Sequence, residues 1–124
     1  MTWTFRFQAR PVNVTDGDTI TLDIDTGFHT THRERIRLLG INCPELHSAD
    51  PEERRAAQTA RSFTVAWLDA ATTNSTTEWP LTIETAKADS FGRYLAKVGR
   101  SDRPNDLSAE LIAVGHAVPF MVPK

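Results

Sequence analysis

The sequence predicts an α+β fold that is mainly β, a five-stranded barrel of the OB type with two helices. Apolar and polar residues alternate with a period of two in much of the first third of the chain, which is typical of half-buried strands. The period changes to that of a helix near residue 51, and two further alternating runs follow. Five strands with a helix between the third and the fourth are typical of a small closed barrel. We expect a single domain over residues 1–124.

The first three predicted strands precede this helix. In the first strand the aromatic residues that alternate with polar ones are Trp3, Phe5 and Phe7. The second strand covers residues 19–24 and leads into a predicted turn at residues 25–27, which read Asp-Thr-Gly. The third extends from about residue 31 to residue 41. Pro44 ends this region because proline cannot donate a hydrogen bond to a sheet.

The first predicted helix covers residues 51–71. Its apolar positions recur every three or four residues and are Ala56, Ala60, Phe63 and Trp67. Asp50 is a favourable N-cap, and Pro51 is well tolerated in the first turn. These signals together predict both the start of the helix and the face that it buries.

Two strands, a short helix and a tail complete the predicted fold. The fourth strand covers residues 79–86 and the fifth residues 93–98, with a turn between them. Residues 108–116 are predicted to form a helix that ends near a glycine. Residues 118–124 contain two prolines and are predicted to be a tail.

Composition narrows the class of protein. The net charge of -2 and the pI of about 6.1 exclude the basic excess of a duplex-wrapping protein, so any nucleic-acid contact is local. Arginine outnumbers lysine 11 to 3, which either suits phosphate binding or only reflects residue usage. One cysteine excludes an internal disulfide. Because no apolar run reaches about 18 residues, we expect no membrane contact. Because no signal peptide is visible, we expect an intracellular protein, which would be secreted only if a leader is missing.

Three segments place acids or arginines at strand ends. They are Asp-Gly-Asp-Thr at residues 16–19, the segment 35–45 that leaves the third strand, and Asp-Ser-Phe-Gly-Arg at residues 89–93. Each alone is more often a turn or a helix lead-in than a site. Together they provide carboxylates for a hard cation, arginines for phosphate and a further carboxylate as a base. This combination is what metal-assisted phosphodiester hydrolysis requires.

The same segments resemble the staphylococcal nuclease-like (thermonuclease) family. The matching residues are 16–19, Arg-Leu-Leu-Gly-Ile-Asn-Cys-Pro-Glu at 37–45, and Gly-Arg at 92–93, and the resemblance extends over about residues 12–120. It implies an OB-fold barrel that hydrolyses DNA and RNA with calcium and with little sequence preference. The chain as numbered stops before the last helix of the family. We expect DNA and RNA as substrates and a monomeric protein.

The resemblance also implies roles for individual residues. Asp18 would be a calcium ligand, with Asn42 and the backbone carbonyl of Cys43 completing the protein's share of the site. Asp16 would lie nearby as a supporting acid.

The implied catalytic residues are Arg37, Glu45 and Arg93. Arg37 would hold the scissile phosphate, and Glu45 would orient or deprotonate the attacking water. Arg93 would stabilise the transition state and the leaving oxygen.

The sequence departs from the family at the metal and substrate positions. Asn42 stands where the family usually has aspartate, so the site loses a negative charge and we expect weaker calcium binding, with Mg²⁺ or Mn²⁺ as alternatives. Phe91, expected to contact substrate, stands where a tyrosine is common, and Met121 and Pro123 also replace tyrosines. Base stacking is therefore the less secure part of the resemblance.

Two other readings of these residues remain open. The spacing of His29, His32, Cys43 and His47 is faintly similar to a zinc site. Asn42 and the missing tyrosines also fit a non-catalytic OB module that binds nucleic acid or protein. Against this second alternative, Arg37, Glu45 and Arg93 are all present, whereas a decayed site would be expected to lose them first.

Overall fold

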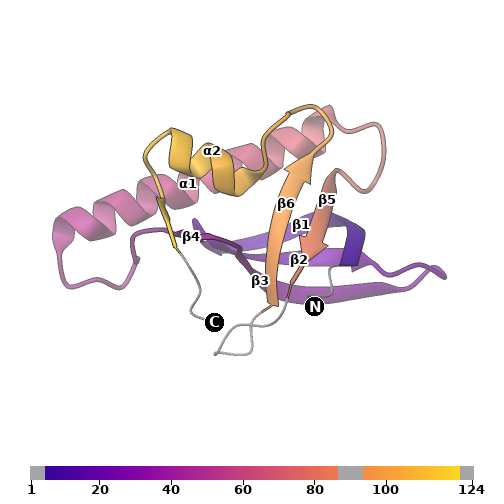
Figure 1. Ribbon diagram of the computed structural model, residues 1–124, viewed down its shortest axis with the longest axis horizontal. Helices are drawn as coiled ribbons and strands as arrows, with labels where there is room; N and C mark the ends of the chain where they lie inside the picture. Colours follow the sequence, from indigo (N-terminus) through magenta and orange to yellow (C-terminus); the bar gives the residue numbers. More distant parts are fainter. Residues whose placement is uncertain (1–4, 87–93, 121–124) are drawn as a thin grey trace.

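A computed structural model describes residues 5–86 and 94–120. Five strands close a barrel in the order β1-β2-β3-β6-β5, as Figure 1 shows. Their bounds are Phe5–Asp16 for β1, Thr19–Asp25 for β2, Thr31–Leu38 for β3, Leu81–Thr85 for β5 and Tyr94–Arg100 for β6. All neighbours pair antiparallel except β3 and β6, which are parallel. The predicted five-stranded barrel of the OB type is confirmed.

The third strand is shorter than predicted. It ends at Leu38 rather than near residue 41, because Gly40 adopts a φ of +84° that turns the chain. Ile41–Asn42 then forms a separate short strand, β4, which pairs with Val118–Pro119, β7. Part of the predicted tail is therefore a strand, which pairs with the chain just after the end of β3.

The first strand is much longer than its aromatic alternation indicates. β1 continues to Asp16 through irregularities between Pro11 and Asn13 and between Val14 and Asp16. These bulges shift the side-chain period, so the alternation disappears from the sequence although the ladder continues. The residues that fill the barrel do alternate, and they include Ala9, Ile20, Leu22, Ile36, Leu38, Ile83 and Val98.

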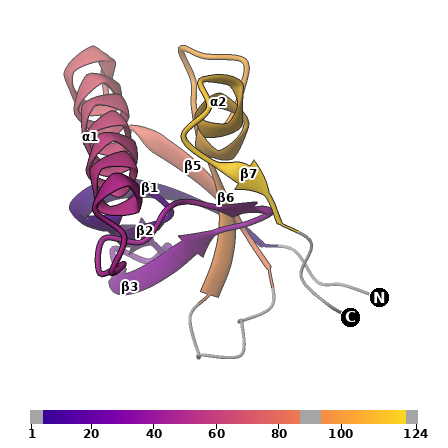
Figure 2. The same cartoon turned by 90° about the vertical axis from the view of Figure 1, so that its left-hand side faces the viewer.

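Two helices lie along the same side of the barrel (Figures 1 and 2). α1 covers Pro51–Asn74, and its N-cap Asp50 accepts a hydrogen bond from the Glu52 amide at 3.0 Å, as the sequence predicts. α2 covers Leu107–Ala113. The buried face of α1 is rotated from the predicted one and consists of Ala57, Ala60, Thr64, Trp67, Leu68 and Ala71. Ala56, which was predicted on the buried face, is exposed. Alanine carries too little apolar surface for its spacing alone to define the buried face of a helix.

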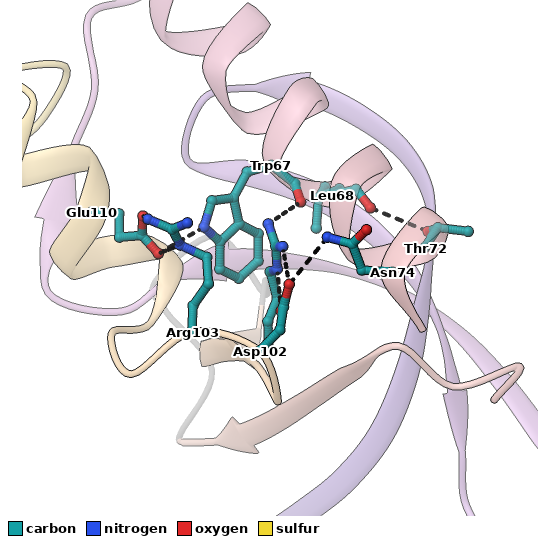
Figure 3. A network of polar contacts seen from close by, with 8 residues as sticks. Trp67, Leu68, Thr72, Asn74, Asp102, Arg103 and Glu110 are labelled. Carbon is teal, nitrogen blue, oxygen red and sulfur yellow. Dashed lines mark hydrogen bonds and ion pairs between the residues drawn. The ribbon is translucent and has the colours of Figure 1, made fainter. Parts of the chain in front are cut away.

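A polar network joins the two helices to each other and to β6 (Figure 3). Glu110 of α2 accepts from Trp67 Nε1 at 2.9 Å and forms a two-bond ion pair with Arg103 at 2.7 and 2.6 Å. Arg100, at the end of β6, donates to the Trp67 carbonyl at 3.0 Å and pairs with Asp102. The pKa of Glu110 lies below its usual range, mainly because Arg103 donates to the charged carboxylate.

We expect Glu110→Gln to lower Tm by about 4 °C at pH 7. Glutamine still accepts from Trp67 but cannot pair with Arg103. Because the folded-state pKa of Glu110 is depressed, the ion pair stabilises the protein above the ordinary glutamate pKa of about 4.3 and is lost as pH falls through the lower folded value. Thermal melts at pH 7 and pH 3 should therefore show a smaller difference at pH 3. Glu84→Gln, which removes a 3.7 Å pair with the exposed Arg6, is the control. A difference of equal size at both pH values would contradict this account.

Candidate active site

Two separate parts of the sequence, residues 16–19 and 35–45, meet at one end of the barrel. The turn between β1 and β2 contributes Asp18, the end of β3 contributes Arg37, and the segment after β4 contributes Cys43. Asp18 Oδ2 accepts a hydrogen bond from the Cys43 amide at 3.0 Å and lies 3.8 Å from Arg37 Nη2. The structure therefore brings together two of the segments that the sequence singles out.

Helix α1 holds the turn between β1 and β2 in place. Thr64 Oγ1 donates to the Gly17 carbonyl at 2.8 Å, and Arg61 Nε donates to the Val14 carbonyl at 3.2 Å. A Cβ at Gly17 would lie 3.0 Å from both Ala60 Cβ and Cys43 Sγ, so any larger residue would force the helix or the thiol to shift. The turn is thus fixed by packing against α1 and the Cys43 thiol.

Arg37 is held on several sides. Its Nη2 donates to Asn42 Oδ1 at 2.7 Å and to the Ile41 carbonyl at 3.1 Å, and its guanidinium lies 5.2 Å from the centre of the Phe120 ring. Only about a tenth of the Arg37 side chain is exposed. Because its neighbours fix the planar group, little side-chain entropy remains to be lost when an anion binds.

Phe120 is a residue of the site that the sequence did not reveal. Its amide donates to the Gly40 carbonyl at 2.8 Å beside the β4–β7 pair, and this places its ring against Arg37. The two residues are far apart in the sequence, and no motif links them. The neighbours of Phe120 in the sequence are also apolar, so its aromatic ring is the one feature that sets it apart.

The side chain of Asn42 points to Arg37, since its Oδ1 is the acceptor described above. The amide oxygen has a second lone pair, so this hydrogen bond leaves capacity for a cation. Asp18 likewise keeps acceptor positions beyond its bonds to the Cys43 amide and to Thr19 Oγ1, the latter at 3.3 Å. Within residues 5–86 and 94–120, no group of three or more His, Cys, Asp or Glu side chains is arranged to hold a metal.

Cys43 is buried, and its thiol is unsuited to nucleophilic chemistry. Burial, together with the charge of Asp18, raises the pKa of this thiol to about 12. The zinc hypothesis also fails on topology. His29 and His32 lie at the end of the β2–β3 hairpin remote from Arg37, which pairs with Thr19 at the opposite end of the ladder. A zinc site that also includes Cys43 and His47 is therefore not formed.

Glu45 is exposed, and its side chain contacts no other described residue through a hydrogen bond or ion pair. It lies two residues after Cys43, whose amide is bonded to Asp18, so the chain keeps Glu45 within about 7 Å of that anchor. The Glu45 carboxylate is thus exposed to solvent, on a segment that the Cys43 amide anchors to Asp18. Phe91, Arg93, Met121 and Pro123 lie outside the described residues.

The family model described as staphylococcal nuclease homologue matches residues 35–124. A search of curated proteins finds none that matches the chain. In the described part of the chain, neither helix is long and apolar enough to cross a bilayer.

Proposed function

The chain belongs to the staphylococcal nuclease family, and on this basis we propose that it is an endonuclease that hydrolyses phosphodiester bonds of DNA and RNA with a divalent cation. The observation that carries the proposal is the placement of Arg37. Its guanidinium is fixed by three neighbours and lies 3.8 Å from the Asp18 carboxylate. Arg37 can therefore bind a phosphate next to a cation held by Asp18.

The donor set suits a hydrated hard cation. Asp18 supplies a carboxylate, and Asn42 and the carbonyl of Cys43 would supply neutral oxygens. With so few charges, water and substrate phosphate must fill the other positions, which is the usual manner of Mg²⁺ and of weak Ca²⁺ sites. Once bound, such a cation polarises a phosphoryl oxygen and favours ionisation of water.

The remaining steps are assigned to side chains of this protein. Arg37 binds the scissile phosphate through its two-pronged guanidinium and opposes the negative charge that grows on it. Glu45, exposed to solvent, accepts a proton from the attacking water. Arg93 is proposed, from the family pattern alone, to stabilise the leaving oxygen.

A second candidate function is a non-catalytic module that binds nucleic acid. The observation that favours it is the 2.7 Å hydrogen bond between Arg37 and Asn42, which occupies the arginine that the reaction needs. The amide is neutral, however, so a phosphate dianion or diester should displace it readily.

The two functions are separated by incubating plasmid DNA and a structured RNA with the protein in Ca²⁺, Mg²⁺, Mn²⁺ or EDTA. We expect cleavage of both substrates with at least one cation and none in EDTA. Binding of the same substrates is measured by fluorescence anisotropy in EDTA. Binding without cleavage in any cation would reject the nuclease and leave the binding module.

We expect Asn42→Asp to tighten Ca²⁺ binding by about ten- to a hundredfold, because it adds a negative charge at an oxygen ligand. Arg37, whose Nη2 lies 2.7 Å from the present amide oxygen, offsets the repulsion between the new carboxylate and Asp18. The stability of the metal-free protein should therefore change little. Calorimetric titration with Ca²⁺ measures the affinity, and Asn13→Asp on the exposed part of β1 is the matched control. An unchanged affinity would show that Asn42 serves Arg37 alone.

A further inference from the structure

The hairpin formed by β2 and β3 extends beyond the barrel on the side remote from β4 (Figure 1). The two strands stay paired to their ends, where Asp25 lies opposite Thr31. β3, in contrast, pairs with β6 only from Ile36 to Leu38. In the described structure the first five residues of β3 therefore have a ladder partner on one side alone. We call residues 25–35 the β2–β3 arm.

The tip of this arm presents an aromatic ring to solvent. Phe28 is 99% exposed, and it occupies the turn together with His29. The Thr30 amide donates to the Gly27 carbonyl at 2.9 Å, which closes the turn. The central residues, Phe28 and His29, have φ values of 56° and 59°. These values are typical of a type I′ turn, in which asparagine and glycine are favoured and a bulky residue is strained. The predicted turn at residues 25–27 therefore lies slightly too early in the chain.

Phe28 does not stabilise the fold in this position. A fully exposed ring contributes no burial, and the left-handed backbone at an aromatic residue is unfavourable by about 1–3 kcal/mol. Asparagine at the same position would be better for stability. An exposed aromatic ring at the tip of a paired hairpin is, however, a stacking platform for an unpaired base.

Arginines lead from this tip to the candidate active site. Because side chains alternate along a strand, Arg33, Arg35 and Arg37 share the outer face of β3, while Ile36 and Leu38 fill the barrel. The first two belong to the arm, and the third is the arginine of the site.

The outer face of the arm carries more arginine charge than the carboxylates near it neutralise. Arg33 donates to Asp23 at 2.8 Å, and Arg10 shares the same carboxylate at 3.5 Å. Arg10 also lies 3.7 Å from Glu78. The side chain of Arg35 has no ion-pair or hydrogen-bond partner among the described residues. Glu34 lies on the opposite face of β3, where it contacts His32.

We propose that the β2–β3 arm binds single-stranded nucleic acid, with Phe28 stacked on a base and Arg35 and Arg33 in contact with phosphates. The proposal rests on the proposed nuclease function, because the bound strand is the one whose phosphate reaches Arg37. Duplex is the poorer ligand, since its bases are already stacked and cannot offer a face to Phe28.

The length of the arm makes the proposal specific. Residues 31 to 37 of an extended strand span about 20 Å. A dinucleotide at Arg37 is too short to reach the tip, whereas a strand of sixteen nucleotides is long enough. Substitutions in the arm should therefore weaken long single strands and leave dinucleotides unaffected.

The test measures binding in EDTA, so that it does not depend on cleavage. The probes are fluorescein-labelled oligothymidylate of sixteen nucleotides, the same strand annealed to its complement, and dithymidylate as a competitor. Phe28→Asn removes the ring and keeps a residue that tolerates the left-handed turn, whereas Phe28→Trp keeps a ring. Arg35→Gln removes the unpaired charge. Ile112→Ala and Arg55→Gln, at exposed positions on the two helices, are the matched controls.

We expect Phe28→Asn to weaken binding of the long single strand about five- to fiftyfold, and Phe28→Trp to preserve it. Arg35→Gln should reduce the slope of log K against log salt by about 0.7, the value for one phosphate contact on a single strand. Dithymidylate binding should not change in either variant.

Three results would overturn the proposal: no binding of the long strand by the wild-type protein, unchanged binding by Phe28→Asn and Arg35→Gln, or equal losses with the duplex or the dinucleotide. Cleavage is measured separately with the cations used above. Cleavage with an inert arm rejects the arm alone, and binding through the arm without cleavage rejects the nuclease function alone.

Discussion

Replacing Arg37 with alanine should lower the rate of cleavage by about 10²- to 10⁴-fold at saturating substrate and cation. The guanidinium is already fixed by Asn42, the Ile41 carbonyl and the Phe120 ring, so it meets the growing charge without reorganisation. Because the opposed charge grows in the transition state, turnover should fall more than substrate affinity. Single-turnover kinetics give the rate, and anisotropy in EDTA gives the affinity.

Arg37→Lys provides the matched comparison. Lysine keeps the positive charge but cannot bind phosphate through two parallel hydrogen bonds, so only part of the rate should return. Phe120→Leu removes the aromatic contact while leaving Arg37 in place, and we expect a much smaller loss. Thermal melts confirm that each variant is folded, since Arg37→Ala leaves the Ile41 carbonyl without its donor. Cleavage by Arg37→Ala at the wild-type rate would show that Arg37 does not act on the scissile phosphate.

The fold was predictable where one physical signal dominates. β2 and the last part of β3 alternate because one face of each lies in the barrel. The end of β3 was placed too late, because Leu38 and Ile41 are both buried and the turn at Gly40 leaves no change in hydropathy. The full length of β1 was missed because its bulges interrupt the alternation of apolar and polar residues. The β4–β7 pair depends on residues more than seventy positions apart, and local patterns carry no information about such a contact.

The site was predictable as a set of residues but not as an arrangement. The meeting of Asp18, Arg37 and Cys43 follows from strand ends that share one end of the barrel. The sequence could not show that Asn42 turns to Arg37 or that Phe120 covers the guanidinium, because both are choices of side-chain orientation set by packing. The catalytic and metal-binding roles of these residues, and of Arg93 and Phe91, stay predictions.

Glu45→Gln should lower turnover by about 10²- to 10⁴-fold, because the variant keeps the size of the side chain and loses its ability to accept a proton. Glu45 has no structural partner to lose: its side chain is exposed and makes no hydrogen bond or ion pair to a described residue. Its carbonyl accepts from the Ser48 amide at 3.3 Å, and the substitution leaves this bond intact. A change in rate therefore reports on chemistry and not on folding.

Binding separates this role of Glu45 from a simple charge effect. Removing a negative charge beside an anionic substrate should leave affinity in EDTA unchanged or slightly improved, while turnover falls. Glu52→Gln in the exposed first turn of α1 makes the same change in charge a few residues away and should cleave normally. Glu45→Asp keeps the carboxylate but moves it by one methylene, so an intermediate rate is expected, because proton transfer requires a positioned base. If Glu45→Gln and Glu52→Gln cleaved equally fast, the attacking water would have to be activated by another group, and the exposed carboxylate of Glu45 would have no part in the reaction.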